Sequence, residues 1–233
     1  MTSMNRMFTD PATGMLLKTW NVFVGCKHDC TYCNAKVLVN TRLKHNLRYR
    51  DGFEKPHLVP ELLTRGFNPG EFIFVAYMGD ISFATPYEFW RILDRIKQFP
   101  DTNFLMITKN PGFFLKWPEP FPLNVILGTT IETNRNHKLS KAPPPLRRWI
   151  DLTTVHHRRK FLSIEPVMDF DLRELTRWIA LLEPSIIEIG ADNYHNKLPE
   201  PSVDKLEQLI SFCRGVCPEV VEKPGLERLR GLV

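Results

Sequence analysis

Nearly continuous apolar segments alternate with amphipathic segments along most of the chain, and this alternation constrains the fold more than any other feature. Segments such as FIFVAYM, FLMIT and NVILG carry apolar residues at successive positions. Strands that are buried on both faces have this pattern, and parallel sheets bury both faces of their strands. The sequence therefore predicts six buried strands, at residues 19–24, 71–77, 103–108, 124–130, 160–164 and 185–189.

Several segments between these strands show helical periodicity. Residues 86–97 carry apolar residues at helical spacing, with Thr85 as the N-cap and Pro86 in the first turn. The other predicted helices span residues 31–45, 172–182 and 203–213. Repeated alternation of strand and helix predicts an α/β protein, in which ligands gather at the carboxyl ends of parallel strands. Periodicity alone leaves open whether the sheet is doubly wound or is closed, wholly or in part, into a barrel.

Two segments interrupt the alternation. Residues 46–70 are mixed, charged and proline-containing, which predicts a loop-rich excursion. Residues 133–148 are polar, basic and proline-rich, and we expect a flexible loop that its prolines hold extended. With no internal repeat, we divide the chain into an N-terminal extension, a core barrel, and a C-terminal helical tail packed on the core. These parts span residues 1–18, 19–199 and 200–233.

Charge and hydropathy restrict the class of protein. The 233 residues have a formal net charge of +5, which suits an anionic ligand or nucleic acid and equally fits a surplus of surface Lys and Arg. No run of about 18 apolar residues occurs, and the first residues lack the apolar stretch of a secretory signal. We therefore expect a cytoplasmic protein without a membrane partner. The oligomeric state is not predicted.

Five cysteines lie in two places, three of them as Cys26, Cys30 and Cys33 and the others at Cys213 and Cys217. An odd count with three members in eight residues is a poor disulfide framework and favours metal or redox chemistry. The second pair is interpreted as small buried hydrophobic residues, with a redox pair or second metal site as the alternative.

The three clustered cysteines follow the first predicted strand and open a helix. Three thiolates on a tight loop can ligate three irons of a cubane cluster and leave one iron open. A structural zinc site needs four ligands, and His28 is awkwardly placed within the loop, so Cys213 or His195 would be the better fourth ligand. Ordinary unliganded cysteines are the third alternative.

The CxxxCxxC spacing, with Tyr32 directly before the third cysteine, resembles the radical S-adenosylmethionine (radical SAM) superfamily. The resemblance implies that Tyr32 is one of the cofactor-binding residues. The resemblance implies a partial (β/α)6 TIM-type barrel of parallel strands that binds a [4Fe-4S] cluster through the three cysteines. It also implies S-adenosylmethionine as a cofactor, whose reductive cleavage gives a 5′-deoxyadenosyl radical that abstracts hydrogen from a substrate. The electron then comes from a reductant such as ferredoxin or flavodoxin.

The resemblance also assigns cofactor-binding roles to residues at the strand ends. Gly79 and Asp80 follow the second strand, where the superfamily binds the methionine amino group; Gly79 would allow close approach and Asp80 would accept from the ammonium. Thr130 and Glu132 end the fourth strand, where the superfamily contacts the ribose. A carboxylate such as that of Glu132 can accept both hydroxyl hydrogens of a vicinal diol.

Four further residues receive roles on the same basis. Lys109 would pair with the carboxylate of S-adenosylmethionine or with an anionic substrate, unless it is solvated. Arg135 would orient Glu132 or hold the ligand carboxylate, and Ile164 would pack against adenine. Glu165 is too costly to bury alone, so we expect it to pair with Lys109 or Arg135 or to face the substrate. Lys109 and Glu165 are the predicted catalytic residues.

The segments ITKNP, LGTTIE and FLSIEP resemble one branch of the superfamily, the uncharacterised radical SAM-like proteins of phages, prophages and some archaea. They resemble spore photoproduct lyases more distantly. The resemblance covers residues 19–195, and nucleic acid is one candidate substrate that it implies. The basic loop 133–148 is the candidate for phosphate contact. The alternative class is a zinc- or cluster-containing nucleic-acid-binding protein without catalysis.

Overall fold

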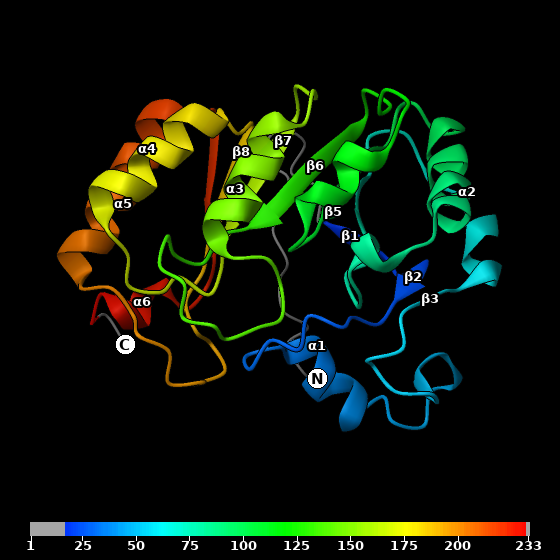
Figure 1. Cartoon of the computed structure of the whole chain (residues 1–233), viewed down its shortest axis with the longest axis horizontal. Coiled ribbons are helices and arrows are strands. Elements are labelled where there is room, and N and C mark those ends of the chain that lie inside the picture. The colour runs from blue at the N-terminus through cyan, green and yellow to red at the C-terminus, as the bar shows by residue number, and fades with distance from the viewer. Residues whose placement is uncertain (1–16, 232–233) are drawn as a thin grey trace. The chain divides into compact units, whose positions relative to one another are not determined.

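The computed structural model describes residues 17–231, so most of the predicted N-terminal extension lies outside the described residues. Seven strands form one parallel sheet in the order β1-β4-β5-β6-β7-β8-β9, and helices connect them (Figure 1). The predicted α/β partial barrel with parallel strands is confirmed. The chain divides into two compact units. Unit 1 contains the described residues up to 108 with 119–126 and 140–142, and unit 2 contains 109–118, 127–139 and the residues from 143 onward.

Unit 1 contains the first three strands of the sheet and the helix that follows the second of them. Strand β4 (Phe72–Val75) pairs in parallel with β1 (Lys18–Trp20) and with β5 (Asn103–Ile107). Helix α2 (Pro86–Lys97) has the predicted bounds. Its N-cap is a reciprocal capping box, in which the Glu88 amide donates to Thr85 and the Thr85 amide donates to the Glu88 carboxylate.

The segment predicted as one strand at 19–24 is instead two strands in unit 1. Strand β2 (Phe23–Val24) leaves the sheet and pairs antiparallel with β3 (His57–Leu58). The break falls at Asn21, whose side-chain oxygen accepts a hydrogen bond from the Met78 amide at 3.0 Å. The excursion at 46–70 contains β3 and two 3-10 helices, η1 (Leu47–Tyr49) and η2 (Pro60–Thr64).

Helix α1 (Asn34–Asn40) is shorter than the predicted helix at 31–45. It begins after the N-cap Cys33, because the Cys33 sulfur accepts from the Lys36 amide. It ends at Thr41, whose hydroxyl donates back to the Val37 carbonyl at 2.7 Å. Two further 3-10 helices are η3 (Ile81–Phe83) in unit 1 and η4 (Pro111–Lys116) in unit 2.

The strands of unit 2 are parallel to one another. Strand β6 (Val125–Thr130), whose first two residues belong to unit 1, pairs with β7 (Lys160–Ile164), which pairs with β8 (Ile186–Ile189). Strand β9 (Glu219–Glu222) adds a seventh strand beside β8, in a segment predicted to be wholly helical. Its four residues, EVVE, are too few for periodicity to show a strand.

Three longer helices of unit 2 are α3 (Pro145–Thr154), α4 (Leu172–Leu182) and α5 (Val203–Val216), and α6 (Leu226–Leu229) follows β9. The α4 prediction is confirmed at both ends. The predicted loop at 133–148 is wrong at its end, because α3 starts at Pro145, and a proline is well tolerated in the first turn of a helix. Among residues 17–231, none of the helices combines the length and apolarity that a bilayer crossing requires.

Candidate functional site

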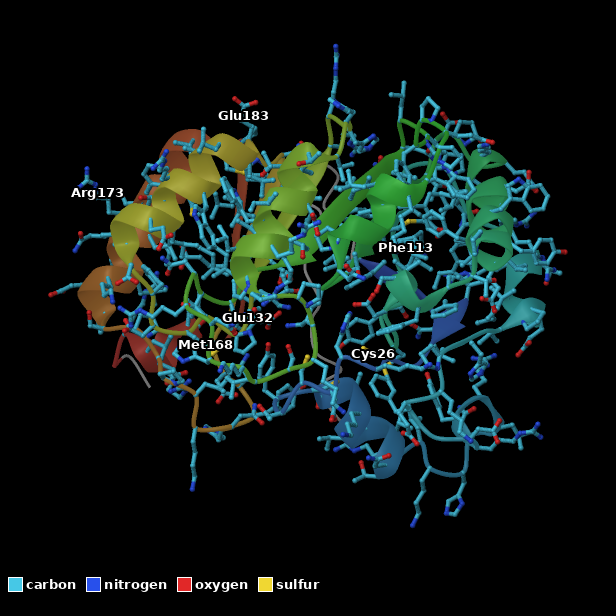
Figure 2. All side chains as sticks on the ribbon, viewed as in Figure 1. Cys26, Phe113, Glu132, Met168, Arg173 and Glu183 are labelled. Atoms are coloured by element: carbon cyan, nitrogen blue, oxygen red, sulfur yellow. The ribbon has the colours of Figure 1, made fainter. Side chains whose placement is uncertain are left out.

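The cysteine loop lies in unit 1 between β2 and α1 (Figure 2, where Cys26 is labelled). Gly25, before the loop, has φ of +85°, and a Cβ atom there would lie 2.9 Å from the Phe53 carbonyl oxygen. Its amide donates to the Met78 carbonyl, and the amide of Cys26 donates to the Phe53 carbonyl at 2.8 Å. Backbone contacts on two sides therefore fix where the loop begins, and only glycine fits this position.

The sulfurs of Cys26 and Cys33 accept backbone hydrogen bonds within unit 1. The His28 amide donates to Cys26 Sγ at 3.3 Å, and the Lys36 amide donates to Cys33 Sγ at 3.4 Å. Burial and then the carboxylate of Asp80 raise the pKa of the Cys26 thiol above its usual range. A bound metal cation reverses this preference because it favours the thiolate.

His28 reaches the end of β4 from within the cysteine loop, a contact that the sequence analysis missed. Its side chain is buried against Phe83, and Nε2 lies 3.1 Å from Asp80 Oδ2. The other oxygen of Asp80 accepts from the Thr108 hydroxyl at 2.6 Å and from the Ser82 amide at 2.9 Å. This network connects the cysteine loop to the carboxyl ends of β4 and β5. The Asp80 carboxylate, predicted to accept from a ligand ammonium, already has these protein partners.

Among the described residues, Cys26, His28 and Asp80 form a group whose ligand atoms all lie within 4.8 Å of one another. These are one sulfur, one imidazole nitrogen and one carboxylate oxygen, a set suited to a divalent metal. The side chains of Cys26, Cys30 and Cys33 do not form a group of this kind in the described part of the chain. One tetrahedral zinc ion would bring three thiolates to about 3.8 Å from one another, from its Zn–S distance.

Gly79 follows β4 in unit 1, as predicted, but contacts between backbone segments explain its identity. It forms a β-bridge with Gly25, and a Cβ atom on Gly79 would lie 2.9 Å from the Gly25 carbonyl oxygen. The close approach that requires glycine is therefore between two segments of the protein. Tyr32 is half-buried within the same loop.

Glu132, which is labelled in Figure 2, follows β6 in unit 2. It forms ion pairs with two cations. Lys109 Nζ contacts one carboxylate oxygen, and Arg148 Nη2 lies 3.0 Å from the other. Burial alone would raise the pKa of Glu132, but Arg148 and Lys109 outweigh it and hold the pKa below its usual range. Arg148 also donates to the Thr130 carbonyl at 2.5 Å. Glu132 is therefore an ionised carboxylate of fixed position.

The predicted partnership between Arg135 and Glu132 is wrong. Arg135 forms ion pairs with Asp169 and Asp171, and its Nη2 lies 2.8 Å from Asp171 Oδ1. Arg148 takes the place that we expected Arg135 to occupy. Lys109 is not a solvated side chain, because Glu132 holds it within unit 2.

Glu165 pairs with Lys223, which follows β9, and not with either predicted partner. Lys223 Nζ also lies 3.7 Å from Glu188 Oε2 in β8, and the Ser163 hydroxyl donates to the other oxygen of Glu188 at 2.7 Å. Burial raises the pKa of Glu165, Lys223 lowers it, and Glu188 raises it, with a net upward shift. The side chain of Glu165 is 27% exposed, so the cluster is accessible at its edge.

Gly190 makes the contact between Glu165 and Lys223 sterically possible. Ile164, the last residue of β7, lies opposite Ile189, the last residue of β8. Glu165 and Gly190 are the residues that directly follow them. A Cβ atom on Gly190 would lie 2.7 Å from Glu165 Oε1, so the Glu165 side chain occupies the space that a larger residue would fill. Ile164 itself is fully buried, and its contact with adenine stays a prediction that this burial does not support.

Three solved structures of radical SAM enzymes share this fold at low sequence identity. The radical SAM methyltransferase from Sphaerobacter thermophilus is 17% identical, with a TM-score of 0.55 over 91% of this chain and 67% of that one. A spore photoproduct lyase variant with dinucleoside spore photoproduct is 9% identical, with a TM-score of 0.56 over 92% of this chain and 65% of that one.

A further spore photoproduct lyase variant, with bound AdoMet and dinucleoside spore photoproduct, is 10% identical. Its TM-score is 0.53, over 89% of this chain and 63% of that one. The chain thus spans about two thirds of the length of these structures. These likenesses show the fold alone, and a comparison with curated proteins finds no match. Residues 15–183 match one family model, and the chain belongs to that family, described as "Protein of unknown function (DUF5131)".

Proposed function

We propose that this protein is a radical SAM enzyme that binds a [4Fe-4S] cluster through Cys26, Cys30 and Cys33. The observation that carries the proposal is the CxxxCxxC loop, which joins a strand to a helix in a fold shared with radical SAM enzymes. Bound there and reduced by an external one-electron donor, the cluster would supply the electron that cleaves S-adenosylmethionine to methionine and a 5′-deoxyadenosyl radical for hydrogen abstraction.

The donor set of the cysteine loop fits such a cluster. Thiolate ligands are stabilised by hydrogen bonds to sulfur, and such bonds also tune the potential of a cluster. The amides of His28 and Lys36 donate bonds of this kind to Cys26 and Cys33. His28 acts as a positioning residue in this proposal, because its contact with Asp80 holds the loop against the end of β4.

The ionised Glu132 supports a role in binding S-adenosylmethionine, with Thr130 preceding it on the same strand end. A carboxylate accepts hydrogen bonds from a vicinal diol, and Lys109 and Arg148 keep Glu132 charged and fixed. The three side chains together carry a net charge of +1, which suits a ligand carboxylate. Gly79 and Asp80 are proposed to bind the methionine end, and Tyr32 to line the loop.

Glu165 is proposed to contact the substrate, because it is partly exposed above a buried polar cluster. Glu188 of β8 and Lys223, which follows β9, set its charge state. Lys109, the other predicted catalytic residue, acts in this proposal through Glu132. Arg135 is proposed only as a support of its own loop, since Asp169 and Asp171 hold it.

Nucleic acid is the substrate class that we favour. Two of the structures that share the fold contain a dinucleoside spore photoproduct, which supports this choice. We also propose that the protein belongs to the branch of the superfamily found in phages, prophages and some archaea. A cytoplasmic location is part of the same proposal.

Anaerobic reconstitution tests the proposal. We expect about four irons and four sulfides per chain, and formation of 5′-deoxyadenosine after addition of dithionite and S-adenosylmethionine. Cys30→Ala should lose the cluster, whereas the matched control Cys213→Ala, a buried cysteine of α5, should retain it. Absence of iron and sulfide in the wild-type protein after strictly anaerobic preparation would sink the proposal.

A second candidate, a metal-containing nucleic-acid-binding protein without catalysis, is favoured by the grouping of Cys26, His28 and Asp80. One zinc ion per chain, without sulfide, is the expected metal content in that case. His28→Ala should then abolish zinc binding and Cys30→Ala should not. In a cluster protein, Cys30→Ala should abolish iron binding and His28→Ala should not. Metal analysis of the two variants therefore separates the candidates.

A further inference from the structure

The excess positive charge of the protein is concentrated beside the cysteine loop. Residues 27–50 contain six Lys and Arg residues and one acidic residue, Asp29, so this segment has a formal charge of +5. That value equals the net charge of the whole chain, and the remaining residues therefore contain 25 basic and 25 acidic side chains. We call residues 27–50 the basic segment.

Packing within unit 1 directs much of the basic segment outward. Leu38, Val39 and Tyr49 pack into a cluster with residues of β2, of the loop before β3 and of the turn after β4. The opposite side of α1 presents Lys36 and Val37, and Val37 is 58% exposed. The remaining cationic residues lie on the loop before α1, on the turn after it and on η1; Lys27, Arg42, Lys44 and Arg50 are exposed, and Arg48 is half-exposed.

The single acidic residue of the segment is outnumbered by the cations that it contacts. Asp29 forms ion pairs with Lys36 at 2.6 Å and with Lys141 at 3.0 Å. Lys141 comes from the short piece 140–142 that also belongs to unit 1, and its amide donates to the His28 carbonyl. Asp29, Lys36 and Lys141 together therefore have a net charge of +1, so this part of the surface keeps an excess of positive charge.

We propose that the basic segment is the docking surface for a small acidic one-electron carrier protein of the ferredoxin or flavodoxin kind. The inference rests on the proposed function, because only a redox centre at the cysteines needs such a partner. Complementary charge accelerates the encounter of two proteins, and exposed apolar side chains such as Val37 and Leu47, which is 81% exposed, suit the centre of a protein interface.

The position of the segment favours an electron carrier over a nucleic acid. Cys33 is the N-cap of α1, and a helix of seven residues is about 10 Å long. A carrier that docks on α1 thus comes within about one helix length of a cluster ligand. Single-stranded nucleic acid is bound by stacking on exposed aromatic side chains. Of the two tyrosines in the segment, Tyr49 is buried in the core and Tyr32 is half-buried.

A pair of charge-reversal variants tests the docking surface. The test variant is Arg42→Glu/Lys44→Glu in the basic segment, and the matched control is Arg173→Glu/Arg177→Glu on the exposed side of α4. Both change the net charge by the same amount on exposed side chains. Reconstituted proteins are mixed anaerobically with reduced flavodoxin or with reduced ferredoxin, and cluster reduction is followed by visible absorbance and electron paramagnetic resonance.

At low salt, the second-order rate constant with either carrier should fall about tenfold or more in the test variant and stay within about twofold in the control. The wild-type rate should fall as salt rises, because exposed charges are screened beyond about 10 Å at 0.1 M. Photoreduced deazaflavin, a small reductant that needs no docking surface, should reduce all three proteins at similar rates. The Leu47→Asn variant, which removes apolar surface without adding a charge, should slow the carrier reaction without changing its salt dependence.

The outcomes separate this inference from the proposed function. If the cluster forms and deazaflavin reduces it, but both charge-reversal pairs slow the carrier equally or neither does, the docking surface is wrong and the proposed function stands. If no cluster forms, the proposed function fails first. If the test variant loses affinity for a single-stranded oligonucleotide while its carrier rate equals that of the wild type, the basic segment binds nucleic acid instead. Equal thermal midpoints of the variants exclude unfolding as the cause.

Discussion

Replacement of Arg148 by methionine should destabilise unit 2 strongly, because it removes one cation from a buried ion triad. Arg148 and Glu132 are 4% and 1% exposed, and Arg148 also donates to the Thr130 carbonyl. Methionine has nearly the length of the arginine stem and leaves no cavity of comparable size. The loss is therefore electrostatic: a buried carboxylate keeps one of its two cationic partners, Lys109.

Breaking a buried ion pair by removal of one partner costs about 3–5 kcal/mol. A domain has about 5–15 kcal/mol of stability, so the loss is a large fraction of the whole. With an m-value of about 2–3 kcal/mol/M in urea, the midpoint of unfolding should fall by about 1–2.5 M. Arg177→Met on α4 is the control, since Arg177 is exposed and its replacement should cost less than about 1 kcal/mol.

The pH dependence gives the same argument an independent readout. The pKa of Glu132 is lowered in the folded protein, so its contribution is present above its unfolded pKa of about 4.3 and is lost as the pH falls toward the folded value. Arg148→Met removes a large part of this depression. The variant should therefore lose less stability than the wild type between pH 5 and pH 3, values that bracket the unfolded pKa. Equal urea midpoints for Arg148→Met and Arg177→Met at pH 7, or parallel pH profiles, would refute the reasoning.

Two further predictions concern the Glu165 cluster. Lys223→Gln removes the cation that pairs with Glu165, which then lies beside Glu188 alone, so the pKa of Glu165 should rise further. The free energy of unfolding should be retained below the unfolded pKa of about 4.3 and should fall as the pH rises through the pKa of Glu165 in the folded protein. Urea titrations at pH 5 and pH 8 measure this, and Glu165→Gln in the same chain should remove the pH dependence if the reasoning is correct. Gly190→Ala should cost about 1–3 kcal/mol, because its Cβ would lie 2.7 Å from Glu165 Oε1. Gly215→Ala, with no atom within 4 Å of its Cβ and in the helix α5, should instead stabilise by about 0.5–1 kcal/mol, and similar effects of the two alanines would contradict the steric argument.

Local signals predicted several elements correctly. Helix α2 has the predicted bounds because a capping box, a first-turn proline and an apolar face are all encoded within its own residues. Helix α4 was predicted for similar reasons, and β7 has the predicted bounds. The apolar strands predicted a parallel α/β sheet, because a strand that is buried on both faces has apolar residues at nearly every position.

The predictions failed where a distant segment decides the outcome. The first predicted strand divides at Asn21 because that side chain bonds to Met78, 57 residues away. Strand β9 depends on the free edge of β8, since four residues cannot form a stable strand alone. Helix α3 was missed because its first residue, Pro145, ends a run of three prolines, and proline suits both an extended loop and the first turn of a helix.

The sequence by itself determined the α/β class, the strand ends that carry polar residues and the cysteine loop, because each depends on neighbours within a few positions. It placed Glu132 and Glu165 at strand ends and predicted that Glu165 needs a partner, since an isolated buried carboxylate is costly. Only the tertiary structure decided which cations they meet. Arg148 lies 16 residues from Glu132 and Lys223 lies 58 residues from Glu165. Sheet register and helix packing choose such partners, and neither is visible in local periodicity.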